Sequence, residues 1–360
     1  MNRETKEELK NIPNELFDFA TGVNADNEML QGTSLTFWHD AMMRFRKNRA
    51  AVISSFVLLF ILIVALASPF LGAYHNKVEN YDGTPNPNMI GQYQSGDNKL
   101  MSPRFPIIEK IGILDGEPKS STSSSYKGAT ENTYFFFGTD DKGRDLFVRT
   151  MVGALVSICF GLVAATIDLV IGVTLGALSG YHGGKTDMFL QRVVEILGSV
   201  PNLIWVMMVI VFVGAGIIPL IVAMLISGWI PMYRMVRSQV MKIKEQEFVL
   251  SARTLGQSDM GIIFKHILPN CMGVIIIWLM FSIPSAIFFE SFMSFLGLGI
   301  TAPIPSLGTL ASNGKEFLRS QPYVLFAPSL VLSAIMLSFN LIADGLRDAF
   351  DPKMRGGDDD

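Results

Sequence analysis

ALVSICFGLVAATIDLVIGVTLGALSGY, residues 154–181, is an almost unbroken run of apolar and small side chains. A helix needs roughly 20 apolar residues to cross the hydrocarbon core of a bilayer, so this run is long enough to span a membrane. Further apolar stretches begin at Ala50, Pro201, Ile217, Cys271 and Tyr323, and the stretch at Pro201 is completed by VVEILGSV just upstream. Because a helix satisfies its backbone hydrogen bonds internally in lipid, the sequence predicts an all-α membrane protein with six transmembrane helices.

Composition argues against several other classes of protein. The chain of 360 residues is 49% hydrophobic and only 17% charged, as is typical of membrane proteins. Its formal net charge of -3 lacks the strong basic field of a dedicated nucleic-acid binder, so we predict no nucleic-acid partner. The two cysteines and four histidines are scattered without ligand-like spacing, so we predict neither a metal site nor a cofactor bound by this chain.

Basic residues near the ends of the spans predict the orientation. Arg44, Arg46, Lys47 and Arg49 precede the first apolar stretch, and further basic residues gather in 234–265 and after residue 346. Since Lys and Arg are enriched in cytoplasmic loops, both termini are predicted to be cytoplasmic. The predicted organisation is a cytoplasmic segment (1–43), a first transmembrane helix (44–74), an extracellular loop (75–145), a five-helix core (146–350) with a cytoplasmic loop at 235–270, and a cytoplasmic tail (351–360).

FGTDDKGRDLF, residues 137–147, has two glycines separated by four residues, as a phosphate-binding P-loop has. A P-loop continues with Lys and then Ser or Thr, whereas Arg144 and Asp145 stand here, and the nearby carboxylates would repel phosphate. The topology also puts this stretch on the side without ATP. We therefore predict the start of a helix, with Thr139 as N-cap, Asp140 and Asp141 in the first turn, and Asp145 paired with Arg149.

The largest cytoplasmic loop contains apolar and small residues at near-helical spacing, namely Phe248, Val249, Ala252 and Leu255, and Gly256 then supplies a helix stop. We expect a short amphipathic helix, a glycine break, and a second short helix that ends near Leu268-Pro269. This element would protrude from the cytoplasmic face and offer a docking surface. An ordinary connecting loop or a helix on the membrane surface fits the same periodicity.

ARTLGQSD, residues 252–259, followed by KHILPN, residues 265–270, resembles the cytoplasmic coupling loop of ABC importer permeases. FGTDDKGRDLFVRTMVGALVS, GYHGGKTDMFLQRVVEILGSVP, ESFMSFLGLG and SFNLIADGLRDAFDPKMR are similar to the peptide-importer branch of these permeases, specifically to the C-type subunit of oligopeptide and dipeptide transporters. The resemblance extends from about Arg44 to Arg355. It implies a type I ABC importer permease architecture, with a cytoplasmic coupling helix, in the plasma membrane of a bacterium.

The resemblance further implies a non-catalytic subunit of an importer of oligopeptides. Two separate ATPase subunits would bind ATP and Mg²⁺ and dock on residues 247–256, beside a homologous B-type permease in the lipid bilayer and an extracellular peptide-binding protein. It assigns ATPase coupling to Glu247, Ser251, Ala252, Arg253, Leu255 and Gly256. Where the family usually has Glu-Ala-Ala, this chain has Leu250-Ser251-Ala252, so the usual acidic contact is absent, replaced by an apolar contact, or made by Glu247.

On the extracellular side, the same resemblance gives the stretch 137–147 a place at the mouth of the transporter. Asp140, Gly143, Arg144 and Asp145 would help to form this mouth or contact the binding protein. Two other functions stay open. A secondary transporter would carry its own coupling-ion site and often internal repeats. Related ABC permeases carry dipeptides, nickel or glutathione.

Several residues inside the spans have two interpretations. Asp168 and Glu290 stand in apolar runs, where a carboxylate either lines the translocation pathway or bonds to a neighbouring helix. The glycines Gly172, Gly176 and Gly180 form overlapping GxxxG patterns, which favour close packing of helices. Three prolines are predicted to kink or interrupt their helices, namely Pro231, Pro284 and Pro328.

Overall fold

The computed structural model describes residues 37–72, 99–106, 109, 114–118, 123–125, 134–301 and 303–350. Over these ranges the chain is helical, and paired extended backbone is limited to two isolated bridges, Arg104 with Asp115 and Thr139 with Asp145. The predicted all-α fold is confirmed. Most of the predicted N-terminal segment (1–43), most of the long loop (75–145) and the tail (351–360) lie outside the described residues.

The helices of the described chain include three π-helical segments, labelled η. In chain order they are α2 (Phe37–Lys47), α3 (Arg49–Gly72), α4 (Leu146–Ile167), η5 (Asp168–Val173), α5 (Thr174–His182), α6 (Gly184–Gly198), α7 (Asn202–Val213), α8 (Ile217–Ala223), η6 (Met224–Gly228), α9 (Ile230–Ile243), α10 (Glu247–Thr254), α11 (Asp259–Ile262), η7 (Ile263–Ile267), α12 (Leu268–Phe295), α13 (Leu307–Lys315) and α14 (Tyr323–Phe350).

Five continuous helices are long and apolar enough to cross a membrane, namely Arg49–Ser68, Leu146–His182, Ile217–Ile243, Asp259–Phe295 and Tyr323–Phe350. α6 and α7 meet the same criterion only as a pair, and they are bent by 74° at the break between them. The described chain thus has five spans, or six if the bent pair is one. The predicted third span, which joins VVEILGSV to the stretch at Pro201, is thus bent at Pro201, because proline disfavours helical backbone at the residue before it.

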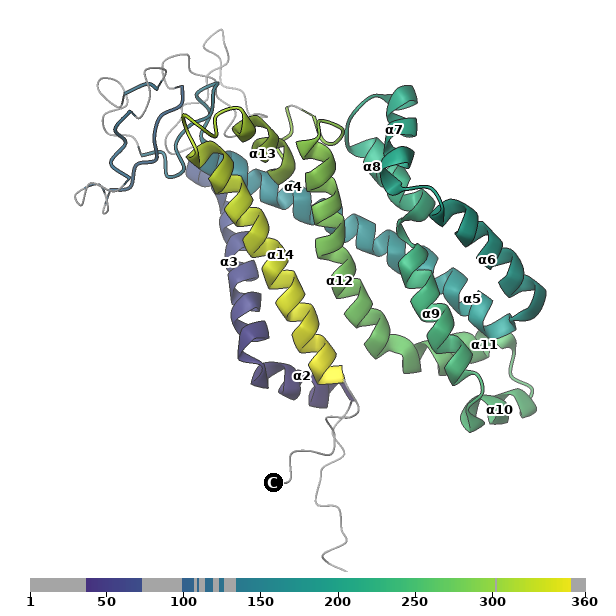
Figure 1. Ribbon diagram of the computed structural model, residues 1–360. Coiled ribbons are helices and arrows are strands. Elements are labelled where there is room, and N and C mark those ends of the chain that lie inside the picture. The colour runs from purple at the N-terminus through teal and green to yellow at the C-terminus, as the bar shows by residue number, and fades with distance from the viewer. Residues whose placement is uncertain are drawn as a thin grey trace, which may run out of the picture.

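The helices form two connected groups (Figure 1). α3, α4, α12 and α14 pack together, and α13 packs on α14, α12 and α4. α4, η5 and α5 form one long helix that joins the groups, because its second half packs on α9. α2, the last turn of α14 and α10 lie at one end of the molecule, which we call the α10 end, and α13 lies at the opposite end.

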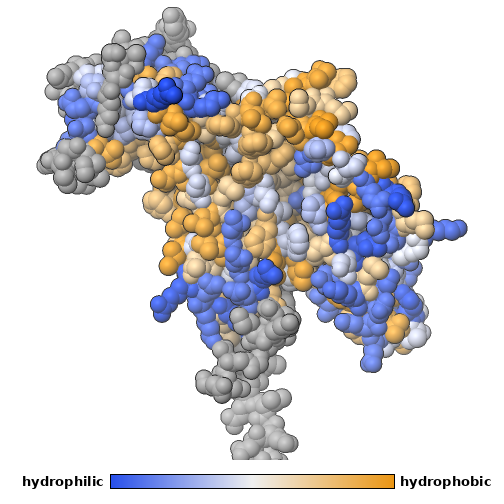
Figure 2. Space-filling model, viewed as in Figure 1, coloured by the Kyte–Doolittle hydropathy of each residue, from blue (hydrophilic) through white to orange (hydrophobic). Residues whose placement is uncertain are grey.

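The surface fits a membrane protein. A broad hydrophobic band crosses the visible face, and hydrophilic side chains gather below it over α2 and α10 (Figure 2). The basic residues of α2 and of the loop around α10 therefore share one end of the molecule. That this end is cytoplasmic stays a prediction from the distribution of Lys and Arg.

The three glycines of the GxxxG patterns lie against α9. A Cβ added to Gly176 would come within 2.8 Å of the Tyr233 carbonyl oxygen, and one added to Gly180 within 2.8 Å of the Arg237 carbonyl oxygen. A Cβ at Gly172 would lie 2.7 Å from the Cβ of Met232. These distances are shorter than van der Waals contact, so only glycine fits at this helix approach. The prediction of close helix packing is confirmed.

Two of the π-helical segments come just before prolines. η6 precedes Pro231, and η7 precedes Pro269. A proline ring clashes with the carbonyl four residues earlier, and the wider π turn, which contains that residue in both cases, relieves the clash. The predicted end of a short helix at Leu268-Pro269 is therefore wrong, since the helix runs on from Asp259 to Phe295. Pro284 and Pro328 likewise lie inside helices that continue past them.

Candidate functional site

α10 protrudes at the end of the molecule opposite α13 (Figure 1). Its outward side carries Phe248, Leu250 and Leu255, which are 38%, 47% and 86% exposed. We call these three residues the α10 apolar surface. The other residues predicted for coupling are also exposed, namely Glu247, Ser251, Arg253 and Gly256, whereas Ala252 is buried. The loop therefore presents apolar side chains to its surroundings at a hydrophilic end of the molecule.

The opposite side of α10 belongs to the core. Val249 is fully buried, and it packs with Ala252 in a cluster that includes Tyr181, Val236 and Ile262. The helix ends at Thr254, and the backbone then turns at Gly256, whose φ of +77° lies in the left-handed region that glycine adopts without strain. The predicted helix and its glycine stop are confirmed. α10 is thus a firmly held helix with one apolar side uncovered.

Polar contacts connect this region to the long helices. The Tyr181 hydroxyl at the end of α5 donates to Asp259 Oδ1 at 2.8 Å, and the guanidinium carbon of Arg253 lies 5.4 Å from the centre of the Tyr181 ring. A hydrogen bond of 2.8 Å joins Gln257 to His266. A displacement of α10 would therefore move α5 and the helix that begins at Asp259.

The stretch 137–147 folds into a buried turn before α4. The N-cap of α4 is Asp145, whose Oδ1 accepts from Phe147 N at 2.8 Å, so the predicted N-cap at Thr139 is wrong. The Thr139 hydroxyl oxygen instead accepts from Met101 N at 2.8 Å. Gly143, whose φ of +75° lies in the left-handed region, reverses the chain between Thr139 and Asp145. The helix therefore begins more than one turn later than predicted.

Asp140 organises this turn. Its Oδ1 accepts from Arg144 N at 3.0 Å, and its Oδ2 accepts from Arg144 Nε at 2.7 Å. Arg149 Nε lies 3.7 Å from Asp140 Oδ2, so Arg149 approaches Asp140 rather than the predicted partner Asp145, which is turned back to cap the helix. The four residues predicted for the mouth do come together, but all four are buried, and the side chains of the three polar ones stabilise the turn.

Burial raises the pKa of the Asp145 carboxyl from 3.8 to about 6, although the amides of Val148 and Phe147 donate to it. The folded chain thus binds this proton more tightly than the unfolded chain, so the free energy of unfolding falls as the pH rises through about 4 to 6, by about 3 kcal/mol in total. Asp145→Asn keeps a capping oxygen and removes the titration. We expect its melting temperature in detergent to vary less over this pH range than that of wild type. If the melting temperatures of wild type and Asp145→Asn changed equally with pH, the assignment of this pH dependence to Asp145 would be contradicted.

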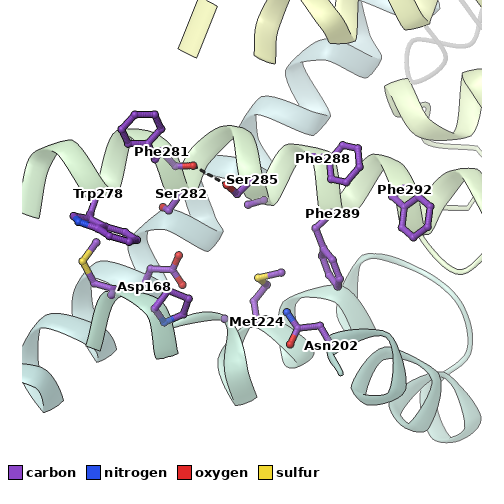
Figure 3. Close-up of a pocket in the computed structure, with 14 residues that line it drawn as sticks. Asp168, Asn202, Met224, Trp278, Phe281, Ser282, Ser285, Phe288, Phe289 and Phe292 are labelled. Atoms are coloured by element: carbon purple, nitrogen blue, oxygen red, sulfur yellow. Dashed lines mark hydrogen bonds between the residues drawn. The ribbon is translucent and has the colours of Figure 1, made fainter. Parts of the chain in front are cut away.

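A cavity of about 370 Å³ lies between α12 and the segments that face it (Figure 3). The aromatic residues on the α12 wall are Trp278, Phe281, Phe288, Phe289 and Phe292. The polar residues of the lining are Asp168, Asn202, Ser282 and Ser285. Asp168, at the start of η5, points from the facing wall toward α12. Of the two carboxylates predicted for the pathway, Asp168 therefore lies on a cavity.

Glu290 lies on α12 but outside the lining of this cavity. It is fully buried and accepts hydrogen bonds from the hydroxyls of Ser157 and Ser294, both at 2.8 Å, and of Ser291 at 3.3 Å. The Ser157 hydroxyl oxygen also accepts from Leu307 N at 3.4 Å. These contacts join α4, α12 and the start of α13, and they support the interpretation of Glu290 as a bond between helices.

Replacing Glu290 with alanine is expected to destabilise the fold by about 2 kcal/mol, because hydrogen bonds to a buried carboxyl are lost and hydroxyls are left without their acceptor. Glu290→Gln keeps an acceptor oxygen and should lose less. The expected losses in Glu290→Ala and Glu290→Gln are checked by the thermal unfolding midpoints of the purified variants. An alanine variant as stable as wild type would show that the serine contacts contribute nothing.

Sequence reasoning missed most of the cavity and one ion pair. The α12 wall was not predicted, although Ser282 and Ser285, three residues apart in an apolar helix, are a polar stripe that could have indicated it. Asp187 and Arg237 form a bidentate pair, with both oxygen–nitrogen distances at 2.6 Å, which ties α6 to α9. They are fifty residues apart, and no local pattern connects them.

Two protein families match the chain. Residues 172–356 match the family described as "Binding-protein-dependent transport system inner membrane component". Residues 36–92 match the "N-terminal TM domain of oligopeptide transport permease C". The first match begins inside η5 and runs past the end of α14, so it includes α10 and all described lining residues of the cavity except Asp168.

Curated relatives match over nearly their whole length. The chain is 39% identical over 347 residues to the oligopeptide transport system permease protein OppC of Bacillus subtilis (strain 168), with 96% of this chain and 100% of that protein covered. It is 41% identical over 326 residues to the dipeptide transport system permease protein DppC of Lactococcus lactis subsp. cremoris (strain MG1363), with 91% and 93% covered. Identity to OppC of Escherichia coli (strain K12) is 36% over 329 residues, with 91% and 95% covered. The chain therefore belongs to the family of binding-protein-dependent transport system inner membrane components.

Proposed function

We propose that this chain is the C-type permease subunit of an ATP-driven ABC importer of oligopeptides. The observation that carries the proposal is the α10 apolar surface, which stays uncovered at a hydrophilic end of the molecule while the other side of the same helix is built into the core. An uncovered apolar surface of this kind fits a contact with another protein. Relatives named as oligopeptide transport permeases support the class of cargo.

The partner at α10 is one of two ATPase subunits, which bind ATP and Mg²⁺. Glu247, Ser251, Arg253, Leu255 and Gly256 are exposed and form the contact, while Ala252 holds α10 on the core. Leu250, 47% exposed, makes an apolar contact at the position where the family usually has an acidic one. Since a ligand shifts a conformational equilibrium only through different contacts in the two states, ATPase closure would drive alternating access by moving α10 together with α5 and the helix that begins at Asp259.

The remaining partners are a homologous B-type permease, which lies beside this chain in the bilayer, and an extracellular peptide-binding protein at the α13 end. Because Asp140, Arg144 and Asp145 are buried, they support the mouth from within, and neighbouring exposed residues make the contact. The α10 end is then the cytoplasmic one. A relative named as a dipeptide transport permease makes dipeptides the second candidate cargo.

The test is uptake of a labelled oligopeptide into proteoliposomes that contain this chain, its partner permease, both ATPase subunits and the binding protein. Uptake is expected to require ATP, and dipeptides serve as competitors that report the cargo class. Gly256→Asp should abolish uptake, whereas Gly256→Asn should retain it. Both side chains are tolerated at positive φ, and no atom lies within 4 Å of an added Cβ, so charge is the difference. Uptake without the ATPase subunits would overturn the proposal in favour of a secondary transporter.

A further inference from the structure

The cavity beside α12 contains a buried carboxyl oxygen without a partner. Asp168 is only 9% exposed, and its Oδ1 makes no hydrogen bond with any described residue. A buried polar atom of this kind is unfavourable unless a ligand or water bonds to it. Gly228 lies close to this oxygen, since a Cβ added there would be 3.5 Å from Oδ1 and 2.8 Å from the Met224 sulfur.

Two interruptions of regular α-helix meet at this point. Asp168 begins η5, and Met224 and Gly228, the first and last residues of η6, also line the cavity. η6 is explained by Pro231, but no proline follows η5 before Pro201. π-helical turns are rare and occur frequently at functional sites, so the irregular backbone at η5 is best explained by the placement of Asp168.

The lining selects the chemical class of the ligand. Asp168 is the single ionisable group among the described residues of the cavity, and its carboxylate form would repel an anion. One carboxylate is too few for a divalent metal ion, which needs several oxygen ligands. The ring of Trp278 extends from α12 on the side that faces Asp168 (Figure 3), and aromatic rings attract ammonium groups. An organic cation with an apolar body fits these features.

We propose that Asp168 binds a primary ammonium group of the cargo, namely the N-terminal ammonium of a peptide or the ammonium of a lysine side chain. The aromatic residues of α12 then hold the apolar part of the cargo, and the Asn202 amide nitrogen offers a hydrogen bond (Figure 3). This inference rests on the proposed function and deepens it, because it assigns a cargo contact within the membrane to this subunit.

The first experiment separates cargo passage from ATPase coupling. Asp168→Asn keeps the shape of the side chain and removes its charge. At saturating loaded binding protein, we expect peptide uptake to fall about tenfold or more, as the loss of a charge-assisted hydrogen bond implies. ATP hydrolysis stimulated by the loaded binding protein should persist, since α10 is untouched. Asp348→Asn, which removes an exposed carboxylate that accepts from Asn48 near the α10 end, is the matched control and should transport normally.

A second experiment reads out binding without transport. Ser285, an exposed residue of the lining, is replaced by cysteine in a chain that carries Cys159→Ser and Cys271→Ala, and its alkylation by a maleimide is followed in the assembled transporter. Tri-alanine should slow the alkylation, and Asp168→Asn should remove this protection. N-acetyl-tri-alanine has no ammonium and should not protect. N-acetyl-Ala-Lys-Ala carries only the lysine ammonium, so protection by this peptide identifies the side chain as an accepted source.

The outcomes separate the two proposals. Wild type without ATP-dependent uptake would speak against the proposed function. Wild-type uptake together with unchanged uptake and protection in Asp168→Asn would overturn the ammonium site alone. Equal protection by tri-alanine and N-acetyl-tri-alanine would also overturn it, as would a cysteine at position 285 that the maleimide never reaches.

Discussion

Peptide uptake is expected to fall by about 100-fold or more when Leu255 is replaced with aspartate, while the chain stays folded in the membrane. Leu255 is 86% exposed and sits at the end of α10, so its replacement removes no core contact. In the docked complex the leucine would be buried, which contributes about 2 kcal/mol, and an unpaired carboxylate in the same place would cost several kcal/mol more. Docking of the ATPase is therefore lost rather than weakened.

Two measurements check this result. ATP-dependent uptake should disappear, and the ATPase subunits should no longer copurify with this chain. Leu255→Met is the control, because it conserves the apolar character and nearly the volume of the side chain. The amount of folded chain, followed by size-exclusion chromatography in detergent, should be the same for all three proteins. Copurification and uptake at wild-type levels in Leu255→Asp would mean that the α10 apolar surface is not where the ATPase docks.

Replacing Gly176 with leucine is expected to prevent accumulation of the folded chain. A Cβ alone would come within 2.8 Å of the Tyr233 carbonyl oxygen and 3.0 Å of the Val236 Cβ, and leucine adds three more carbons in the same place. Overpacking of a tight interface costs about 1–3 kcal/mol for small insertions, and here the backbone of α9 would have to move away. The expected destabilisation is thus well above about 3 kcal/mol, a large part of the stability of a typical domain.

Gly198→Leu is the matched control for this experiment. Gly198 also lies in a helix, but a Cβ there would be 3.5 Å from Ile230 Cδ1, an ordinary contact, and the residue is exposed. Membrane-inserted yield and thermal unfolding in detergent should be near wild type for Gly198→Leu and strongly reduced for Gly176→Leu. Similar yields for both variants would mean that α5 and α9 do not pack through these glycines.

The fold could be predicted from sequence where a local pattern has one structural outcome. The apolar runs are too long for anything but membrane helices, and α10 with its stop at Gly256 follows from spacing and from the conformational freedom of glycine. Prediction failed where local signals compete. Pro269 was expected to end a helix, yet the helix continues past it, because the π turn before it accommodates the proline ring. Pro201, in contrast, does break α6 from α7.

The candidate sites could likewise be predicted from the sequence only where all their residues belong to one local segment. The residues of α10 could be assigned from one segment, because the whole element is local. The turn before α4 was mispredicted, since Thr139, Asp140 and Asp145 all suit an N-cap, and contacts with Met101 and Arg149 decide among them. Asp168 and Glu290 could not be distinguished in the sequence, as both are carboxylates in apolar runs.

The sequence by itself determined the class of the protein, because its apolar spans require a bilayer and its glycine stripe requires a close helix neighbour. Its basic residues predict the orientation. Only the tertiary structure decided that this neighbour is α9, that Glu290 is satisfied by three serine hydroxyls, and that Asp168 is left with a free oxygen on a cavity. The physical reason is that hydrophobicity and backbone conformation are properties of a local segment. Whether a buried polar atom has a partner depends on residues more than a hundred positions away, as with Ser157 and Glu290.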